Sequence, residues 1–351
     1  MKKQTLSKSQ YNLSVEQAET YLKTIFPRVS RTFSITIPQL PSPLRRVVMN
    51  AYLLARILDT IEDDNALTME QKFYYGKRFI WILYNDIESA KEFALEVAPQ
   101  LSNQTNEAER DLLYNLPLVL KIIQTFNTRQ REAMQRCVKI MWEGMQNFLE
   151  RRSEGGLETL DDVNDYCYHA AGVVGELLTD LFSDYSNKIA QNSNEMQKLA
   201  ISFGRGLQIS NILYDHWEDR KDGICWLPRS LYGNELYNLK PENYNENYRK
   251  SQTKMVNIAY KNLQEALKYT LLIPASEAGI RRFLFWTISF SLFALRGIQK
   301  NPSFSQKEEI KVPRTNIVKV MMVTRILGTG DATLTKFFNS VSETIPDLII
   351  E

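Results

Sequence analysis

Two short acidic clusters lie inside otherwise apolar stretches of the chain, at residues 59–63 (DTIED) and 215–219 (DHWED). If both stretches are helical, the first and last aspartates of each cluster lie one turn apart on one face, with the glutamate beside them. Carboxylates at this spacing repel each other, and in apolar surroundings they need a cation. We therefore expect two facing walls that hold metal ions between them. The candidate metal ligands are Asp59, Glu62, Asp63, Asp215, Glu218 and Asp219.

Each cluster continues a polar stripe along its expected helix. Tyr52 and Arg56 lead up to the first cluster at helical spacing, and Gln208 and Asn211 lead up to the second. A solvated helix end would account for either cluster alone, because acidic residues are common there. A polar stripe on an apolar helix, however, is what a helix that lines a cavity needs. Its presence in both segments favours a shared site.

The ligand types favour Mg²⁺. Carboxylate oxygens without a cluster of thiolates or imidazoles suit this ion, which is commonly shared between one or two carboxylates and a substrate phosphate. Bound Mg²⁺ neutralises a diphosphate and stabilises it as a leaving group. The chain has no GxxxxGK[ST] or GxGxxG loop, which argues against a nucleotide triphosphatase or a Rossmann enzyme. Loss of diphosphate in an aromatic-lined pocket would leave a carbocation that aromatic faces stabilise.

With these features the chain resembles the squalene/phytoene synthase family, and squalene synthases in particular. The matching stretches are SRTF at residues 30–33, YLLARILDTIEDD at 52–64, YCYHAAGVVGELLTDLFSD at 166–184 and NILYDHWEDRKDGICWLP at 211–228. The resemblance implies an all-α isoprenoid-synthase fold. It also implies Mg²⁺-dependent head-to-head coupling of two allylic prenyl diphosphates through a cyclopropylcarbinyl diphosphate. In squalene synthases NADPH then reduces the rearranged cation.

The resemblance also assigns residues. The two acidic clusters match the Mg²⁺–diphosphate motifs of the family. Arg31 and Arg56 match arginines that bind diphosphate, a role that suits the paired donors of a planar guanidinium. Ser30 and Phe33 flank that site. Without the resemblance, Arg31 could also be interpreted as an ordinary surface charge. The candidate substrate-binding residues are Ser30, Arg31, Phe33, Arg56, Gln208 and Asn211.

The third stretch departs from the family pattern at the residues credited with acid–base work. Squalene synthases typically read YCHYVAG and dehydrosqualene synthases YCYGVAG, whereas this chain reads YCYHAAG. We assign the role to Tyr168 first, with His169 as a proton carrier near neutral pH; a hydrogen-bonded core histidine is the simpler alternative. Gly172 and Gly175 are expected to let a hydrocarbon tail approach the backbone. The candidate catalytic residues are Tyr168, His169 and Tyr52.

Two arginines that usually help to hold diphosphate in the family are absent. Tyr214 stands before the second acidic cluster and Ile224 after it, where the family carries these arginines. Fewer cations would retain the diphosphate of an intermediate less firmly. We expect Arg220, Lys221 or Arg229 to compensate.

The carboxyl-terminal third bears on the reductive step. Residues 311–322 (KVPRTNIVKVMM) resemble a squalene synthase segment that phytoene-type synthases usually lack. Lys311 and Arg314 are the candidate NADPH contacts, because cations beside a 2′-phosphate are the simplest way to prefer NADPH. A basic pair in a loop also commonly faces solvent.

The favoured function is coupling of two farnesyl diphosphates with NADPH reduction to squalene. One alternative is a presqualene diphosphate, dehydrosqualene or phytoene synthase without the reductive step. Another is a non-catalytic relative that acts as an interaction protein.

Composition and patterning predict an all-α, single-domain helical bundle with a central apolar cavity. The 351 residues include 44% hydrophobic and 11% aromatic residues and only 14 glycines. We expect residues 1–18 to be a mobile amino-terminal segment and residues 19–351 to be the isoprenoid-synthase domain, since no linker or repeat interrupts them. Amphipathic patterns predict helices at residues 15–24, 43–65, 72–92, 106–125, 130–150, 160–181, 195–219, 242–271, 280–298 and 317–341.

Charge and cysteine usage limit the partners and the compartment. A net charge of +2 is too balanced to indicate a nucleic-acid partner. Three cysteines without a CxxC motif indicate a reducing cytoplasm, where the protein is expected with or without peripheral association with a membrane. No signal region is visible, and no uncharged run approaches the about 20 residues of a membrane span. Residues 283–295 (FLFWTISFSLFAL) are expected to form a buried helix.

Overall fold

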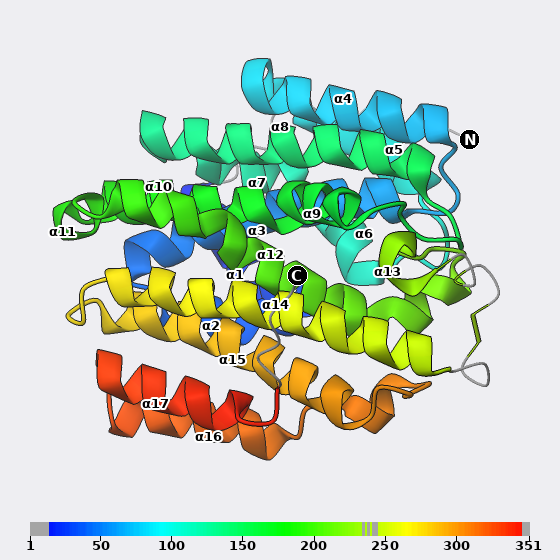
Figure 1. Cartoon of the computed structure of the whole chain (residues 1–351). Helices are drawn as coiled ribbons and strands as arrows, with labels where there is room; N and C mark the ends of the chain where they lie inside the picture. Colours follow the sequence, from blue (N-terminus) through cyan, green and yellow to red (C-terminus); the bar gives the residue numbers. More distant parts are fainter. Residues whose placement is uncertain (1–13, 234–235, 237–238, 241–244, 346–351) are drawn as a thin grey trace. The chain divides into compact units, whose positions relative to one another are not determined.

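The structure of the protein, a computed structural model, describes residues 14–233, 236, 239–240 and 245–345. Every regular element in this part of the chain is a helix, so the all-α prediction is confirmed (Figure 1). The α-helices are α1 (Val15–Val29), α2 (Phe33–Thr36), α3 (Ser42–Asp63), α4 (Met69–Asn85), α5 (Ala90–Val97), α6 (Glu107–Tyr114), α7 (Leu116–Ile123), α8 (Thr128–Arg151), α9 (Leu160–Cys167), α10 (Val173–Tyr185), α11 (Asn187–Ala190), α12 (Ser193–Lys221), α13 (Arg229–Tyr232), α14 (Glu246–Leu272), α15 (Ala278–Lys300), α16 (Arg314–Ile326) and α17 (Asp331–Ser342). The 3₁₀ helices are η2 (Ile37–Gln39), η3 (Ile87–Ser89), η4 (Ala98–Gln100) and η8 (Lys307–Ile310), and η5 (Tyr168–Gly172) is a π-helical turn.

The chain divides into two compact units, each of which is described by itself. Unit 1 comprises Met1–Ile37 and Arg45–Lys139, and unit 2 comprises Pro38–Leu44 and Ile140–Glu351. The division falls inside the span predicted as one domain, residues 19–351. Of the predicted amino-terminal segment, residues 1–13 lie outside the described residues, and residues 15–18 form the first turn of α1.

Unit 1 contains α1, most of α3, and α4 to α7 around an aliphatic core. Capping boxes at Ser14 and Thr68 satisfy the first amides of α1 and α4 and so fix where these helices begin. Helix α7 has six buried aliphatic side chains and packs against α1 and α5. The Asp64 carboxylate, just after α3, accepts hydrogen bonds from the Ser102 amide and the Thr105 hydroxyl. These bonds tie the acidic end of α3 to the loop that precedes α6.

Unit 2 is centred on α12, a 29-residue helix that packs against α10, α14 and α15. Glycines allow the closest approaches. A Cβ atom on Gly204 would lie 2.1 Å from the Ala171 carbonyl oxygen, and one on Gly175 would lie 2.1 Å from that of Ala200. The expectation that Gly172 and Gly175 admit a hydrocarbon tail is therefore wrong, because α12 and neighbouring side chains fill that space.

Helix α15 is the one helix in the described part of the chain with the length and composition of a membrane span. Its most apolar window has a mean hydropathy of 1.3, and 67% of that window is buried inside the protein. The helix packs against α12, α14, α16 and α17. The prediction of a buried helix at residues 283–295 is confirmed.

Three predicted helices are divided in the structure. Residues 106–125 form α6 and α7, which meet at Asn115, because Pro117 in the first turn of α7 cannot extend the hydrogen-bond ladder of α6. Residues 317–341 form α16 and α17, which are separated where Gly328 adopts a φ of 79°. Residues 72–92 extend over α4, η3 and the start of α5, with a break at Asp86. The single-helix predictions at these three places are wrong.

Candidate functional site

Five of the predicted site residues line one cavity of about 320 Å³ within unit 1. The cavity lies where the end of α1 and the start of α2 meet residues of α3 and α6. Arginine is the commonest charged residue in its wall, which favours an anionic occupant. The lining residues are Arg28, Val29, Ser30, Arg31, Thr32, Phe33, Tyr52, Arg56, Asn106 and Glu109.

A hydroxyl-stabilised turn places Arg31 at this cavity. The Ser30 hydroxyl accepts a hydrogen bond from the Phe33 amide at 3.1 Å, and the Ser34 hydroxyl donates to the Arg31 carbonyl at 2.9 Å. These bonds satisfy backbone groups at the start of α2, where no helical partner exists. The Arg31 side chain is exposed, so its guanidinium is accessible to a ligand that enters from solvent.

Arg56 is held by neighbours on α3 and α6. Its Nη2 donates to the Tyr52 hydroxyl (3.1 Å), which donates in turn to the Val29 carbonyl (3.0 Å). Its Nη1 lies 4.0 Å from an Asp59 oxygen and 3.7 Å from a Glu109 oxygen. Its Nε is buried and has no hydrogen-bond partner within the residues that the structure describes. A buried donor left unpaired is costly, so this atom marks a place for an acceptor on a ligand.

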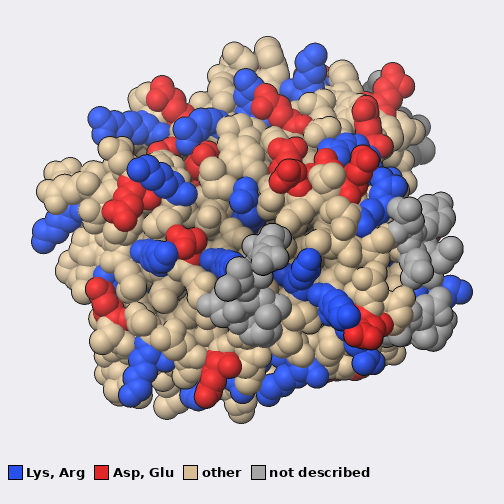
Figure 2. Space-filling view, in the orientation of Figure 1, with Lys and Arg blue, Asp and Glu red and all other residues tan. Residues whose placement is uncertain are grey.

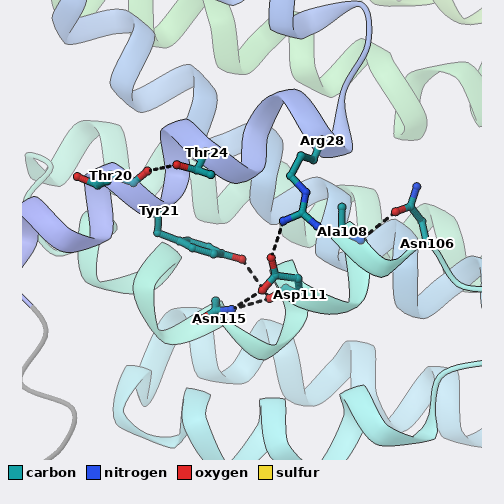
Figure 3. Close-up of polar contacts among 8 residues, drawn as sticks. All are labelled: Thr20, Tyr21, Thr24, Arg28, Asn106, Ala108, Asp111 and Asn115. Atoms are coloured by element: carbon teal, nitrogen blue, oxygen red, sulfur yellow. Dashed lines mark hydrogen bonds and ion pairs between the residues drawn. The ribbon is translucent and has the colours of Figure 1, made fainter.

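Arg28 lines the same cavity but is already paired. Figure 3 shows Arg28 of α1 reaching the Asp111 carboxylate of α6, at 3.1 Å. The Tyr21 hydroxyl donates to the Asp111 backbone carbonyl, and the Asn115 side-chain amide donates to the Asp111 carboxylate. Burial, reinforced by the Asp111 charge, raises the pKa of Tyr21. This network fastens α6, which carries Glu109, to α1.

The carboxylates beside Arg56 are perturbed by their surroundings. Although the Asp59 side chain is 31% exposed, crowding by protein atoms raises its pKa to about 7; Arg56 opposes the rise, and the charges of Asp63 and Glu109 add to it. Burial and the Asp63 charge also raise the pKa of Glu109. Glu62 is only 9% exposed, whereas Asp63 is exposed. Mutual repulsion among these carboxylates favours the binding of a cation, and Glu109 is a member that the sequence did not indicate.

In unit 2 the second acidic cluster holds an ammonium group. The Lys307 Nζ lies 2.5 Å from an Asp215 oxygen and also pairs with the Glu218 carboxylate. It lies 5.7 Å from the centre of the Tyr214 ring. A cation of the protein itself thus stands beside two of the predicted metal ligands. These carboxylates are therefore arranged to bind a cation.

The segment that carries Lys307 is fastened to α12. The buried Trp217 indole donates to the Phe304 carbonyl at 2.8 Å. The Glu309 carboxylate accepts from the Ser305 amide and so closes the turn that precedes η8. Lys307 could not be predicted from the sequence, because it is distant in sequence from α12 and belongs to no periodic pattern.

His216, inside the second cluster, is a buried structural residue. Its Nδ1 donates to the Leu213 carbonyl at 3.0 Å, which leaves Nε2 to accept from the Tyr248 hydroxyl at 3.1 Å. Burial lowers the pKa of His216 to about 4, so the imidazole is neutral at pH 7. The neutral ring joins α12 to α14 between the acidic residues.

Tyr168 and His169 open the π-helical turn η5. Such turns widen a helix by one residue and are frequent at functional sites. Both side chains are partly exposed, and their ring centres lie 5.1 Å apart. His169 Nδ1 lies 2.9 Å from the Asp165 carbonyl oxygen. The ring packs against Gly144 of α8, where a Cβ atom would lie 2.2 Å from the His169 Cβ.

The remaining predicted residues lie in unit 2. Gln208 is partly exposed and Asn211 exposed, on α12 ahead of the second cluster. Lys311 and Arg314 are exposed, between η8 and the first residue of α16. Arg220, one of the residues expected to replace the missing arginines, donates to the Glu154 carbonyl at 3.1 Å. The expectation that the two acidic clusters face each other involves both units and stays a prediction.

Comparison with known proteins identifies the family. The sequence model of the squalene/phytoene synthase family matches residues 26–316, most of the chain. The chain belongs to the squalene/phytoene synthase family. Relatives in this family include the squalene synthase of Schizosaccharomyces pombe, which is 28% identical over 84% of this chain and 62% of that protein. Squalene synthase 1 of Arabidopsis thaliana is 27% identical over 80% of this chain and 65% of that protein. The chain thus spans less than two thirds of the length of these relatives.

Solved structures show that this squalene/phytoene synthase family member has the expected fold. TcSQS with the ligand E5700 aligns with a TM-score of 0.77 at 20% identity, over 94% of this chain and 91% of that chain. A dehydrosqualene synthase in complex with a ligand aligns with a TM-score of 0.60 at 16% identity, over 93% of this chain and 98% of that chain. The predicted all-α isoprenoid-synthase fold is confirmed.

The donors in this family member fit Mg²⁺. Within the described part of the chain no three His, Cys, Asp or Glu side chains converge into a ready-made metal cluster. Mg²⁺ does not need one, because it keeps several waters and binds through one or two carboxylates together with substrate phosphates. Asp59 with Asp63 supplies such a pair in unit 1. Asp215 with Glu218, which already holds a cation, supplies one in unit 2.

Proposed function

We propose that this protein is a Mg²⁺-dependent prenyltransferase that joins two molecules of farnesyl diphosphate head to head through presqualene diphosphate. We propose further that it reduces the product to squalene with NADPH. The observation that carries the proposal is the buried Nε of Arg56, which has no hydrogen-bond partner in the part of the chain that the structure describes. Its cavity also contains the exposed Arg31 and lies beside Asp59. A diphosphate with its counter-cation needs positive and negative protein groups side by side. Membership of the family supports the same chemistry.

The arginines would bind the diphosphate oxygens. A guanidinium offers paired donors at a fixed angle, which suits the two oxygens of one phosphate group. Tyr52 holds Arg56 by a hydrogen bond, so the guanidinium does not have to reorganise as negative charge moves onto the leaving group. Mg²⁺ would neutralise that charge. Its ligands would be Asp59, Glu62 and Asp63 in unit 1, and Asp215, Glu218 and Asp219 in unit 2.

Proton transfer is assigned to the π-helical turn. As diphosphate leaves with the electron pair of the C1–O bond, C1 of one farnesyl chain bonds to the C2=C3 double bond of the other. A proton is lost as the cyclopropane closes. We assign the relay of this proton to the Tyr168 hydroxyl, with His169 as the alternative carrier. The aromatic faces of the pair would stabilise the cationic carbon.

The reductive step depends on the carboxyl-terminal segment. Lys311 and Arg314 are exposed cations that would contact an NADPH phosphate. The alternative is a synthase that makes presqualene diphosphate, dehydrosqualene or phytoene without NADPH. It is favoured by Tyr214 and Ile224, which stand in place of two diphosphate-binding arginines. A non-catalytic relative would have no need of the intact acidic clusters.

Product analysis by mass spectrometry tests the proposal. The purified protein is supplied with farnesyl or geranylgeranyl diphosphate and Mg²⁺, with and without NADPH. We expect squalene from farnesyl diphosphate when NADPH is present and an unreduced product when it is absent. The same product in both conditions would remove the reductive step. No product from either substrate would overturn the proposed activity.

A further inference from the structure

Helix α16 presents an apolar ridge to solvent. The ridge residues Val318, Met322, Ile326 and Leu327 are 50, 54, 72 and 67% exposed. The first three follow at intervals of four residues, so they cover about 80° of the helix surface. Single exposed aliphatic residues are ordinary on a protein surface, but a contiguous ridge of them marks an interaction site.

The opposite face of α16 is already anchored in unit 2. Val320 and Thr324 are fully buried, and the Trp286 indole of α15 donates to the Thr324 hydroxyl at 2.8 Å. This contact fixes the rotation of α16 about its axis. The rotation of the helix therefore keeps the ridge on the solvent side, and no other element in the described part of unit 2 covers it.

Cations flank the ridge on both sides. At about 100° per residue, Lys319 lies just beyond Ile326 and Arg325 just beyond Val318. Both side chains are exposed, and the Arg325 guanidinium lies 5.6 Å from the centre of the Trp286 ring. Residues 314–330 contain no Asp or Glu. In Figure 2 the lower part of the face, over α16 and α17 of Figure 1, is mostly tan, with scattered blue and red side chains.

We propose that α16 is a membrane-surface helix that inserts its ridge among the acyl chains of a bilayer containing anionic lipids. A helix that lies in the plane of a bilayer needs an apolar strip bordered by Lys and Arg, whose stems reach outward to the lipid phosphates. The ridge and its two flanking cations have this order around the helix. A protein partner would instead require acceptors matched to individual donors. The uniform positive charge beside the ridge matches the negative surface of anionic lipids.

Vesicle sedimentation tests the surface directly. The full chain is mixed with vesicles of phosphatidylcholine alone, or of phosphatidylcholine with phosphatidylglycerol, and the bound fraction is measured. We expect binding to the anionic vesicles. The double substitution Met322→Ser and Ile326→Ser should lower the partition coefficient at least about tenfold, because burial of even one aliphatic side chain in the bilayer raises this coefficient by about that factor. Lys319→Glu should weaken binding to the anionic vesicles several-fold and leave binding to neutral vesicles unchanged.

A matched control is Leu95→Ser on α5 of unit 1, where a single leucine is 57% exposed. This variant should bind vesicles like the wild type. Unchanged far-ultraviolet circular dichroism would show that the α16 variants fold. Failure of the wild type to bind anionic vesicles would overturn the proposal. An unchanged partition coefficient for the double variant would also overturn the proposal. If that variant instead lost self-association in sedimentation equilibrium, the ridge would be an interface between copies of the chain and not a membrane surface.

Insertion can be observed at a single residue. The native cysteines are buried, none more than 3% exposed, so a cysteine placed at Met322 can be labelled with an environment-sensitive fluorophore. We expect a blue shift when anionic vesicles are added. A label at Asn339→Cys, on the exposed side of α17, should not shift. Equal shifts at both sites, or none at Met322→Cys, would contradict insertion of the ridge.

Discussion

Arg56 and Arg28 line the same cavity, yet their guanidinium groups are in different situations. Arg28 is paired with Asp111, whereas the Nε of Arg56 has no hydrogen-bond partner among the described residues. Replacing Arg56 by Lys keeps the charge and removes the Nε donor and the planar fork. We expect Arg56→Lys to lower kcat/KM for the prenyl diphosphate by about 10- to 100-fold, as for loss of a hydrogen bond to a charged group. Steady-state kinetics at saturating Mg²⁺ would measure this loss.

The matched control for that substitution is Arg28→Lys. It removes a guanidinium from the same cavity wall but leaves a cation to pair with Asp111, so kcat/KM should change by less than about threefold. Equal losses in the two variants would show that the unpaired Nε of Arg56 has no special role.

Lys307 would compete with a metal ion for Asp215 and Glu218. Its ammonium contacts both carboxylates. Lys307→Met removes this competitor, and Mg²⁺ should bind a few times more tightly in isothermal titration calorimetry, as expected for loss of a partly exposed ion pair. The same variant should turn over prenyl diphosphate more slowly, because it lacks the cation near Tyr214 that would stabilise the negative charge of the leaving diphosphate.

Lys311→Met serves as the control in the calorimetric experiment. This lysine is on the same segment, and its side chain is exposed. It should leave the Mg²⁺ affinity unchanged. Weaker Mg²⁺ binding in Lys307→Met would mean that the lysine assists metal binding rather than competing with it.

At the residue scale, the sequence was informative where chemistry repeats along a helix. The spacing of Tyr52, Arg56 and Asp59 on α3 indicated contacts that the structure contains. Glu109 and Lys307 could not be found in this way, because each reaches its acidic cluster from another element and is isolated in sequence. The replacement of a family arginine by Tyr214 was the signal that a cation had to come from elsewhere.

At the element scale, the π-helical turn depends on a glycine in a neighbouring helix. A methyl group on Gly144 of α8 would lie 2.2 Å from the His169 Cβ, and the His169 Cβ cannot move without its backbone. We expect Gly144→Ala to lower the free energy of unfolding by about 1–3 kcal/mol, the usual cost of overpacking, even though alanine is the better helix former. Urea unfolding followed by circular dichroism would measure the change.

Gly330→Ala is the matched control for Gly144→Ala. Its Cβ would have no neighbour within 4 Å among the described residues, and the backbone has an ordinary φ of −65°. This substitution should change the free energy of unfolding by less than about 0.5 kcal/mol. If the two variants were equally stable, the close packing of His169 on α8 would not contribute to the stability of the turn.

Periodicity predicted that the helices exist, but it did not predict the breaks at Asp86, Asn115 and Gly328. The apolar pattern continues through Asn115 and through Gly328, so it gives no sign that the backbone turns there. Pro117 is a local signal for the first break. The phase change in η5 has no such signal, because a π turn is set by what packs around it rather than by residues 168–172 themselves.

For the molecule as a whole, His216 links stability to pH. Its pKa is about 4 in the folded protein and about 6.5 in an unfolded chain. The neutral form is thus favoured by folding, so this contribution is fully present above pH 6.5 and is lost as the pH falls toward 4. It amounts to on the order of 3 kcal/mol. Urea unfolding from pH 7 to pH 4 should show a steeper loss of stability in the wild type than in His216→Phe.

The second histidine provides the control for the pH experiment. His169, at 22% side-chain exposure, is the only other histidine in the chain. A His169→Gln variant in the same experiment distinguishes an effect of the buried imidazole from an effect of removing any histidine. A wild-type slope equal to that of His216→Phe would show that the buried imidazole does not control acid stability.

Seating of the α16 ridge on a bilayer would also determine which concentration of substrate governs the rate. An enzyme seated on lipid meets an amphiphilic substrate in two dimensions, and farnesyl chains themselves partition into bilayers. Turnover would then follow the mole fraction of substrate in the surface rather than its amount per volume of solution. Inert lipid added at constant bulk substrate would slow the reaction by surface dilution. A hydrocarbon product would stay in the bilayer, where the enzyme that consumes it would have to work as well.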